Sequence, residues 1–165
     1  MGMGKLLGKF DFVLILLQCF GLQFVFTGIY RLYVAYNADE WDALLGKSTN
    51  TYEAISDVRL GQFFANHFYS KTLIAFVIII LVLLLNRKFK VGIINNVFIL
   101  VLTLIFTRNL FFASPYLTWK IEYFSQLFGE NTKSTFLISG LFFLIFGLAV
   151  IWKSLVFNVI SRQNT

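Results

Sequence analysis

The chain has 165 residues, of which 58% are hydrophobic, 19% are aromatic and 13% are charged, and its formal net charge is +6. A soluble domain usually has about 45–50% apolar and about 25% charged residues. These values exclude an ordinary water-soluble enzyme and a disordered tail, and they predict an integral membrane protein of one domain.

Four apolar segments are long enough to cross a bilayer, whose core of about 30 Å requires roughly 20 residues per helix. They cover about residues 12–32, 70–86, 91–113 and 136–152. Each must be helical, because a spanning segment has to satisfy its own backbone hydrogen bonds. We therefore expect an all-α four-helix membrane bundle that forms a single transmembrane domain over residues 1–165.

The charged residues are divided unevenly between the two sides of these segments. One side has a single acid, Asp11, and seven basic residues: Lys5, Lys9, Arg87, Lys88, Lys90, Lys153 and Arg162. The other side has seven acids and six basic residues, among them Arg31 and Lys71. The excess of Lys and Arg marks the cytoplasmic side, so both termini are expected in the cytoplasm. Because topology accounts for the positive charge, nucleic-acid binding is not expected.

The two outer links, about residues 33–69 and 114–135, are longer than connections need to be. Each contains apolar residues at helical spacing. In the first link these are Leu60, Phe63, Phe64, His67 and Phe68, and in the second they are Leu117, Ile121, Phe124 and Phe128. We expect two amphipathic helices in the outer interface. They either roof the bundle or serve only as interface anchors.

Two pairs of glycines recur seven residues apart in the first and last segments. Gly21 and Gly28 lie on one stripe of the first helix, and Gly140 and Gly147 lie on one stripe of the fourth. Small residues allow close helix approach in lipid. The spacing therefore predicts that these two antiparallel helices pack glycine face to glycine face, although glycine is also common in spanning helices generally.

The third apolar segment contains a polar stripe through most of the membrane. It consists of Asn96, Thr103, Thr107 and Ser114. Such side chains are expected to face the bundle interior, where Gln18 and Gln23 of the first segment are candidate partners. The stripe indicates either interhelical hydrogen bonds or a polar site for a ligand, formed by Asn96, Thr103, Thr107, Gln23 and Arg108.

Arg108 is the one basic residue of the third segment, five residues from its outer end. An ionisable side chain at membrane depth is a functional hypothesis by default. The guanidinium either anchors the helix by reaching Glu122 or a lipid phosphate, or contacts a ligand. His67 is the only histidine, and we expect an interface residue there or, alternatively, a proton carrier.

Signatures of enzyme chemistry are missing from the sequence. Cys19 is the only cysteine, and there is no Gly-x-Ser-x-Gly, phosphate-binding glycine loop or His-Glu-x-x-His. We expect no catalytic residues, no metal site and no cofactor other than a bound lipid or quinone. No acid lies within a span, which disfavours an ion-coupled pump.

The layout resembles the DoxX-like group of small four-helix membrane proteins. The first helix ends in Gly28-Ile29-Tyr30-Arg31, followed by a long outer link, a helix pair with a short basic inner turn, and an amphipathic outer link. The resemblance implies a four-helix membrane fold. Tyr69-Ser70-Lys71 stands where an acidic residue is expected, so no functional residue is carried over.

Three classes of function follow from these patterns. The first is a non-enzymatic accessory, structural or assembly subunit of a larger membrane complex. The second is a DoxX-like protein that binds a quinone or lipid in an outer-leaflet pocket, and the third is a transport or channel subunit. The expected partners are membrane lipids and other membrane subunits or further copies of the chain. The expected location is a bacterial inner membrane.

Overall fold

The computed structural model describes residues 10–44, 57–109, 120, 123–127 and 131–163. All its regular elements in these ranges are helices: α2 (Phe12–Tyr36), α3 (Ala38–Leu44), α4 (Asp57–Lys88), α5 (Ile93–Asn109) and α7 (Thr132–Gln163). Lys120 and residues 123–126 are also helical. The expectation of an all-α chain is confirmed for the described residues.

Three of the helices are long and apolar enough to cross a membrane: Phe12–Tyr36, Gly61–Lys88 and Thr132–Ile160. At a rise of about 1.5 Å per residue, the 25 residues of α2 extend about 37 Å, which exceeds the bilayer core. The apolar part of α5, Ile93–Ile105, is shorter. Helices of this length and composition indicate an integral membrane protein.

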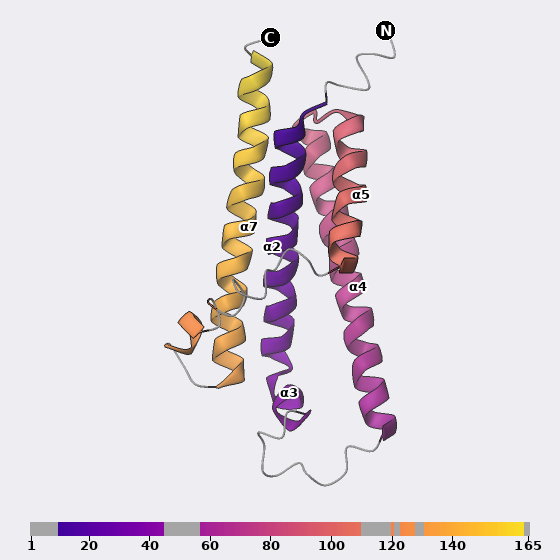
Figure 1. The fold of residues 1–165 in the computed structure, drawn as a ribbon, viewed down its shortest axis with the longest axis vertical. Helices are drawn as coiled ribbons and strands as arrows, with labels where there is room; N and C mark the ends of the chain where they lie inside the picture. Colours follow the sequence, from indigo (N-terminus) through magenta and orange to yellow (C-terminus); the bar gives the residue numbers. More distant parts are fainter. Residues whose placement is uncertain (1–9, 45–56, 110–119, 121–122, 128–130, 164–165) are drawn as a thin grey trace.

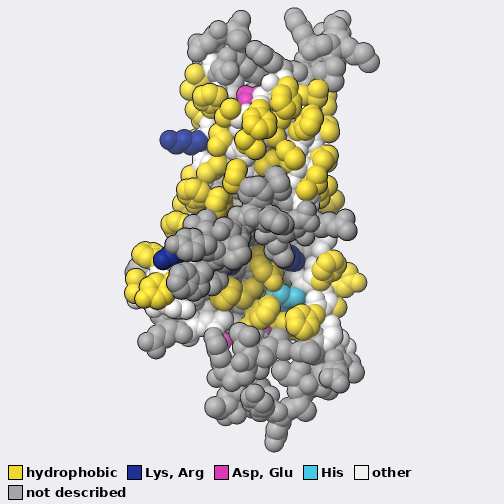
Figure 2. All heavy atoms as spheres, in the orientation of Figure 1, with side chains coloured by type: hydrophobic (Ala, Val, Ile, Leu, Met, Phe, Trp, Pro, Cys, Tyr) yellow, Lys and Arg dark blue, Asp and Glu magenta, His cyan; other side chains and the backbone are white. Residues whose placement is uncertain are grey.

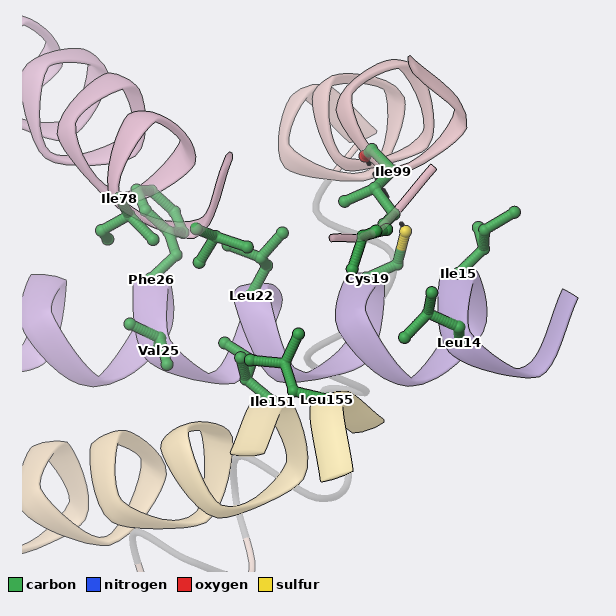
Figure 3. Packing of buried hydrophobic residues seen from close by; sticks show 12 residues of the cluster. Leu14, Ile15, Cys19, Leu22, Val25, Phe26, Ile78, Ile99, Ile151 and Leu155 are labelled. Atoms are coloured by element: carbon green, nitrogen blue, oxygen red, sulfur yellow. Dashed lines mark hydrogen bonds between the residues drawn. The ribbon is translucent and has the colours of Figure 1, made fainter. Parts of the chain in front are cut away.

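Helix α2 is the centre of the arrangement. In Figure 1 it lies between α7 on one side and α4 and α5 on the other. Just over half of its apolar segment, 56%, is buried, against 33% for α7 and 17% for α4. Its core side chains meet Ile78 of α4, Ile99 of α5, and Ile151 and Leu155 of α7 (Figure 3). One helix therefore holds the others together.

The surface of the helices is largely hydrophobic. Hydrophobic side chains cover most of the upper part of the face drawn in Figure 2. Many are more than half exposed, including Leu73, Phe76 and Leu84 of α4 and Ile145 and Phe157 of α7. A soluble monomer rarely exposes so large an apolar surface, whereas a lipid-facing surface requires one.

Local hydrogen bonds fix the contact between α2 and the α4–α5 pair at the end of the molecule where α2 begins. Asp11 caps α2 by accepting a hydrogen bond from the Leu14 N–H at 2.9 Å, and the Asp11 N–H donates to Asn95 Oδ1 at 3.0 Å. The turn between α4 and α5 closes with Lys90 at φ 54° and a bond from the Val91 N–H to the Asn86 carbonyl. Asp11 therefore ties the start of α2 to α5 and is not simply a solvated charge.

The first outer link differs from the expectation of a separate interfacial helix. Residues 60–68 form the first turns of α4, which runs unbroken from Asp57 to Lys88. No glycine turn or proline interrupts the sequence between this amphipathic stretch and the apolar segment, so the helix continues. The link also contains α3, which was not expected and begins directly after Asn37 caps the end of α2. In the second link, Leu117, Ile121 and Phe128 lie outside the described residues.

Candidate functional site

A cluster of buried amides joins three helices near the α4–α5 turn. Gln18 and Asn86, both fully buried, exchange two hydrogen bonds of 2.8 and 2.7 Å. Asn86 Nδ2 also donates to Asn96 Oδ1 at 2.8 Å, and Asn96 Nδ2 donates to the carbonyls of Val91 and Gly92. Every amide in this cluster has partners within the protein, so it acts as an interhelical clamp.

Helix α5 also contacts α2 about one and two helical turns beyond Asn96, through Cys19 of α2. Thr103 Oγ1 donates to Cys19 Sγ at 3.8 Å, and the Cys19 thiol lies 3.9 Å from the Ile99 carbonyl. Gln23 is buried, but its Oε1 has no hydrogen-bond partner in the described part of the chain. The side chains of Thr107 and Arg108, together with Ser114 and Glu122, lie outside the described residues. The structure therefore brings Asn96 and Thr103 to α2 at separate points, and a ligand role for the stripe stays a prediction.

The four glycines meet in the pairs that their spacing predicts. An ideal Cβ on Gly28 would lie 2.8 Å from the Gly140 carbonyl oxygen and 2.5 Å from the Leu144 amide nitrogen. An ideal Cβ on Gly147 would lie 2.7 Å from the Gly21 carbonyl oxygen. These distances are too short for any real side chain, so backbone packs directly against backbone where α2 meets α7.

Arg31 occupies the same contact one turn beyond Gly28. The side chain is 5% exposed, and its Nη1 donates to Ser139 Oγ at 2.9 Å. The guanidinium lies over the rings of Phe136 and Phe143, 5.1 and 5.4 Å from their centroids. Sequence reasoning placed Arg31 among the outer charges. Its position three residues after Gly28 was the available signal that it faces α7.

His67 is enclosed by aromatic side chains from three helices. Its ring centroid lies 4.6 Å from that of Trp41 and 4.9 Å from that of Phe63, with Tyr30 and Tyr33 at 5.7 and 5.1 Å. The side chain is 7% exposed, and its Nε2 has no hydrogen-bond partner among the residues that the structure describes. The sequence placed this histidine on an apolar helix face, but it gave no indication that α2 and α3 supply the surrounding rings.

Two apolar hollows lie on either side of the start of α7. One, of about 260 Å³, is lined by Tyr30, Val34, Trp41, Thr132 and Phe136. The other, of about 310 Å³, is lined by Lys120, Phe124, Ser125, Ile138, Ser139 and Phe142. Both are at the end of α2 and α7 that lies away from the α4–α5 turn. They are suited to hydrocarbon rather than to a charged substrate.

Within the described ranges, no group of three or more His, Cys, Asp or Glu residues is placed to hold a metal ion. Cys19 is a free, buried thiol. Comparison with protein-family models, curated proteins and solved structures gives no match to this chain. The DoxX-like resemblance therefore stays a prediction from the sequence layout.

Proposed function

We propose that the chain crosses a bacterial cytoplasmic membrane four times, as a four-helix bundle with both termini in the cytoplasm, and that it is a non-enzymatic accessory or assembly subunit of a larger membrane complex. The arrangement of charges supports this orientation. The start of α2, the α4–α5 turn and the end of α7 lie at one end of the molecule (Figure 1). The turn carries Arg87, Lys88 and Lys90, whereas α3 at the other end carries Asp39, Glu40 and Asp42.

The proposed orientation is tested by labelling in intact cells. A cysteine at Ser48 is expected to react with a membrane-impermeant maleimide added from outside, and a cysteine at Lys88 is expected to react only after the membrane is opened. Replacing Cys19 with alanine removes the background signal. External labelling at Lys88 with protection at Ser48 would reverse the orientation.

The observation that carries the subunit proposal is the exposure of α4. This 32-residue helix is buried over only 17% of its apolar segment. Its exposed apolar side chains form a continuous surface that includes Leu73, Phe76, Leu81 and Leu84. A further membrane helix is able to pack along such a surface, because association in lipid depends on side-chain packing rather than on removal of apolar surface from water.

Purification from the native membrane in a mild detergent tests this role. We expect other membrane proteins to co-purify in fixed stoichiometry. Phe76→Ala with Leu84→Ala is expected to reduce their recovery, and the matched control on α7, Leu141→Ala with Ile145→Ala, is expected to retain them. Recovery of the chain alone from the wild-type membrane would contradict the proposal.

A second candidate function is the binding of a quinone or lipid near the outer leaflet, as in the DoxX-like interpretation. The two apolar hollows beside the start of α7 favour this candidate. Organic extraction of the purified chain, followed by mass spectrometry, is expected to release a lipid or quinone in stoichiometric amount. A chain that retains neither would remove this candidate.

A further inference from the structure

The turn between α4 and α5 has a lysine at the position where a helix usually ends in glycine. The Lys90 N–H donates to the Arg87 carbonyl at 3.1 Å, and the Val91 N–H donates to the Asn86 carbonyl at 2.9 Å. These two bonds form a Schellman motif, whose left-handed residue is usually glycine. Lys90 has φ 54° there and is the one non-glycine residue with a positive φ in the described ranges. A side chain costs free energy in this conformation, because its Cβ crowds the backbone.

The orientation of the chain in the membrane does not require a lysine at this position. Basic residues anywhere in a short turn favour its placement on the cytoplasmic side. Arg87 and Lys88 already supply two positive charges in the last turn of α4. A basic residue at a strained backbone position therefore indicates a use for its charge at that particular point.

The turn holds three cations on a fixed support. Arg87, Lys88 and Lys90 are all exposed. Asn86, directly before them, is fully buried and pairs with Gln18 of α2. The backbone that carries the three side chains is thus tied to the bundle, and a ligand of the turn meets basic groups that are already gathered in one place.

The protein itself offers little negative charge to these cations. In the part of the chain that the structure describes, Asp11 is the one acid at this end of the molecule (Figure 1). Its carboxylate accepts the Leu14 N–H as the cap of α2. Three cations against one acid leave a net positive charge, so this end of the molecule suits an anionic ligand.

The surroundings of the turn indicate that this ligand also contains hydrocarbon. Phe89, between the two lysines, packs edge-on against Trp152 of α7, with 5.9 Å between the ring centroids. Trp152 is 60% exposed, and Leu84 and Leu85 of α4 are exposed beside the turn. Tryptophan at the end of a spanning helix is typical of the membrane interface. A phospholipid has its phosphate at the level of the basic residues and its acyl chains beside such apolar side chains.

We propose that the α4–α5 turn binds one anionic phospholipid, that Lys90 contacts its phosphate, and that the Phe89–Trp152 pair packs against the upper part of an acyl chain. This site is at the opposite end of the molecule from the two apolar hollows. It goes beyond the functions proposed above and requires only that the chain lies in a membrane, so the subunit role and this site are able to fail independently.

The test uses the full-length chain in detergent, with native mass spectrometry to count retained lipids. The probes are phosphatidylglycerol and phosphatidylcholine with the same acyl chains, because the choline group neutralises the phosphate of the second lipid. One Lys or Arg near a lipid surface changes anionic binding about 5-fold. We expect the wild-type chain to prefer phosphatidylglycerol at least about 5-fold, and we expect Lys90→Gly to reduce this preference about 5-fold.

Lys90→Gly also relieves the left-handed strain, so its fold should be at least as stable as the wild type in an SDS titration. Weaker lipid binding by a chain of equal or greater stability is a result that misfolding does not produce. If Lys90→Gly is instead less stable than the wild type, the strain that supports this site is absent and the proposal is wrong.

Two further variants separate a local site from general charge. Lys90→Arg keeps the cation and is expected to keep the preference for phosphatidylglycerol. Lys133→Gln is the matched control, because it removes one exposed charge at the start of α7, away from the turn, and it should also keep the preference. Equal binding of the two lipids by the wild type, an unchanged preference in Lys90→Gly, or an equal loss in Lys133→Gln or Lys90→Arg would overturn the site.

Discussion

The two sides of α2 are held by different means. Towards α7, backbone meets backbone at two pairs of glycines, and the contact runs along most of both helices. Towards α4 and α5, side chains fill the space, and amide hydrogen bonds are concentrated near the α4–α5 turn. The contact with α7 depends on glycines, which have no side chain to hold the helices apart. The contact with α4 and α5 depends on particular polar side chains.

This difference follows from the lipid environment of the helices. Burying apolar side chains gives little advantage in a bilayer, because lipid is as apolar as leucine. Two helices therefore associate either by approaching closely enough for extensive van der Waals contact or by pairing polar groups that lipid leaves unsatisfied. Towards α7 the chain uses close approach together with one buried hydrogen bond from Arg31 to Ser139, and towards α4 and α5 it uses mainly the pairing of buried polar groups. Variants of the two sides should therefore fail for different reasons.

The largest effect is expected at the glycine contact. In Gly28→Ala the new Cβ would lie 2.5 Å from the Leu144 amide nitrogen, a backbone atom that moves only if the helices separate. We expect a loss of about 1–3 kcal/mol in the free energy of unfolding, measured by SDS titration in mixed micelles.

Gly61→Ala is the matched control for this substitution. Gly61 lies in α4, and a Cβ there would meet nothing within 4 Å. The control is expected to be neutral or to gain up to about 1 kcal/mol from helix propensity. A similar loss in both variants would show that glycine acts through the backbone alone and not through the contact with α7.

A smaller effect is expected at the amide clamp. Gln18→Leu leaves Asn86 Oδ1 buried without the donor that it now has. We expect a loss of about 1–2 kcal/mol in the same titration. The double variant Gln18→Leu/Asn86→Leu should lose less than the sum of the single variants, because the two amides pair with each other. Strict additivity would argue against the clamp.

The smallest effect is expected for Ser139→Ala, which removes the hydroxyl that accepts a hydrogen bond from Arg31 Nη1. We expect a loss of about 1 kcal/mol, because the guanidinium keeps its contacts with Phe136 and Phe143. Ser154→Ala is the control, since Ser154 is equally buried but its hydroxyl donates within α7 to the Ile151 carbonyl. An equal loss in both would mean that the bond to Arg31 contributes nothing.

The sequence predicts those parts of the fold that depend on spacing along one helix. Seven-residue intervals are sufficient to place Gly21 and Gly28 on the side of α2 that meets Gly140 and Gly147. Long apolar runs likewise predict helices, because a membrane permits few other structures.

Two other features that depend on how helices meet were not predicted. Asn86 is the last residue of the second apolar segment, next to the basic turn, and its side chain pairs with Gln18 and closes the clamp. The rings around His67 come from α2, α3 and the start of α4, whose juxtaposition depends on α3 folding back after Asn37. The spacing of residues within each segment gave no sign of these two encounters, because neither belongs to a repeated stripe.

The central claim is that α2 and α7 associate through paired glycines, and a double-mutant cycle tests it most directly. Gly28→Ala, Gly140→Ala and the double variant are compared by their free energies of unfolding. Once one alanine has separated the helices, the second should cost less, so we expect the double variant to lose at least about 0.5 kcal/mol less than the sum. The cycle of Gly28→Ala with Gly61→Ala should be additive. Additivity for Gly28 and Gly140 as well would contradict the paired-glycine contact.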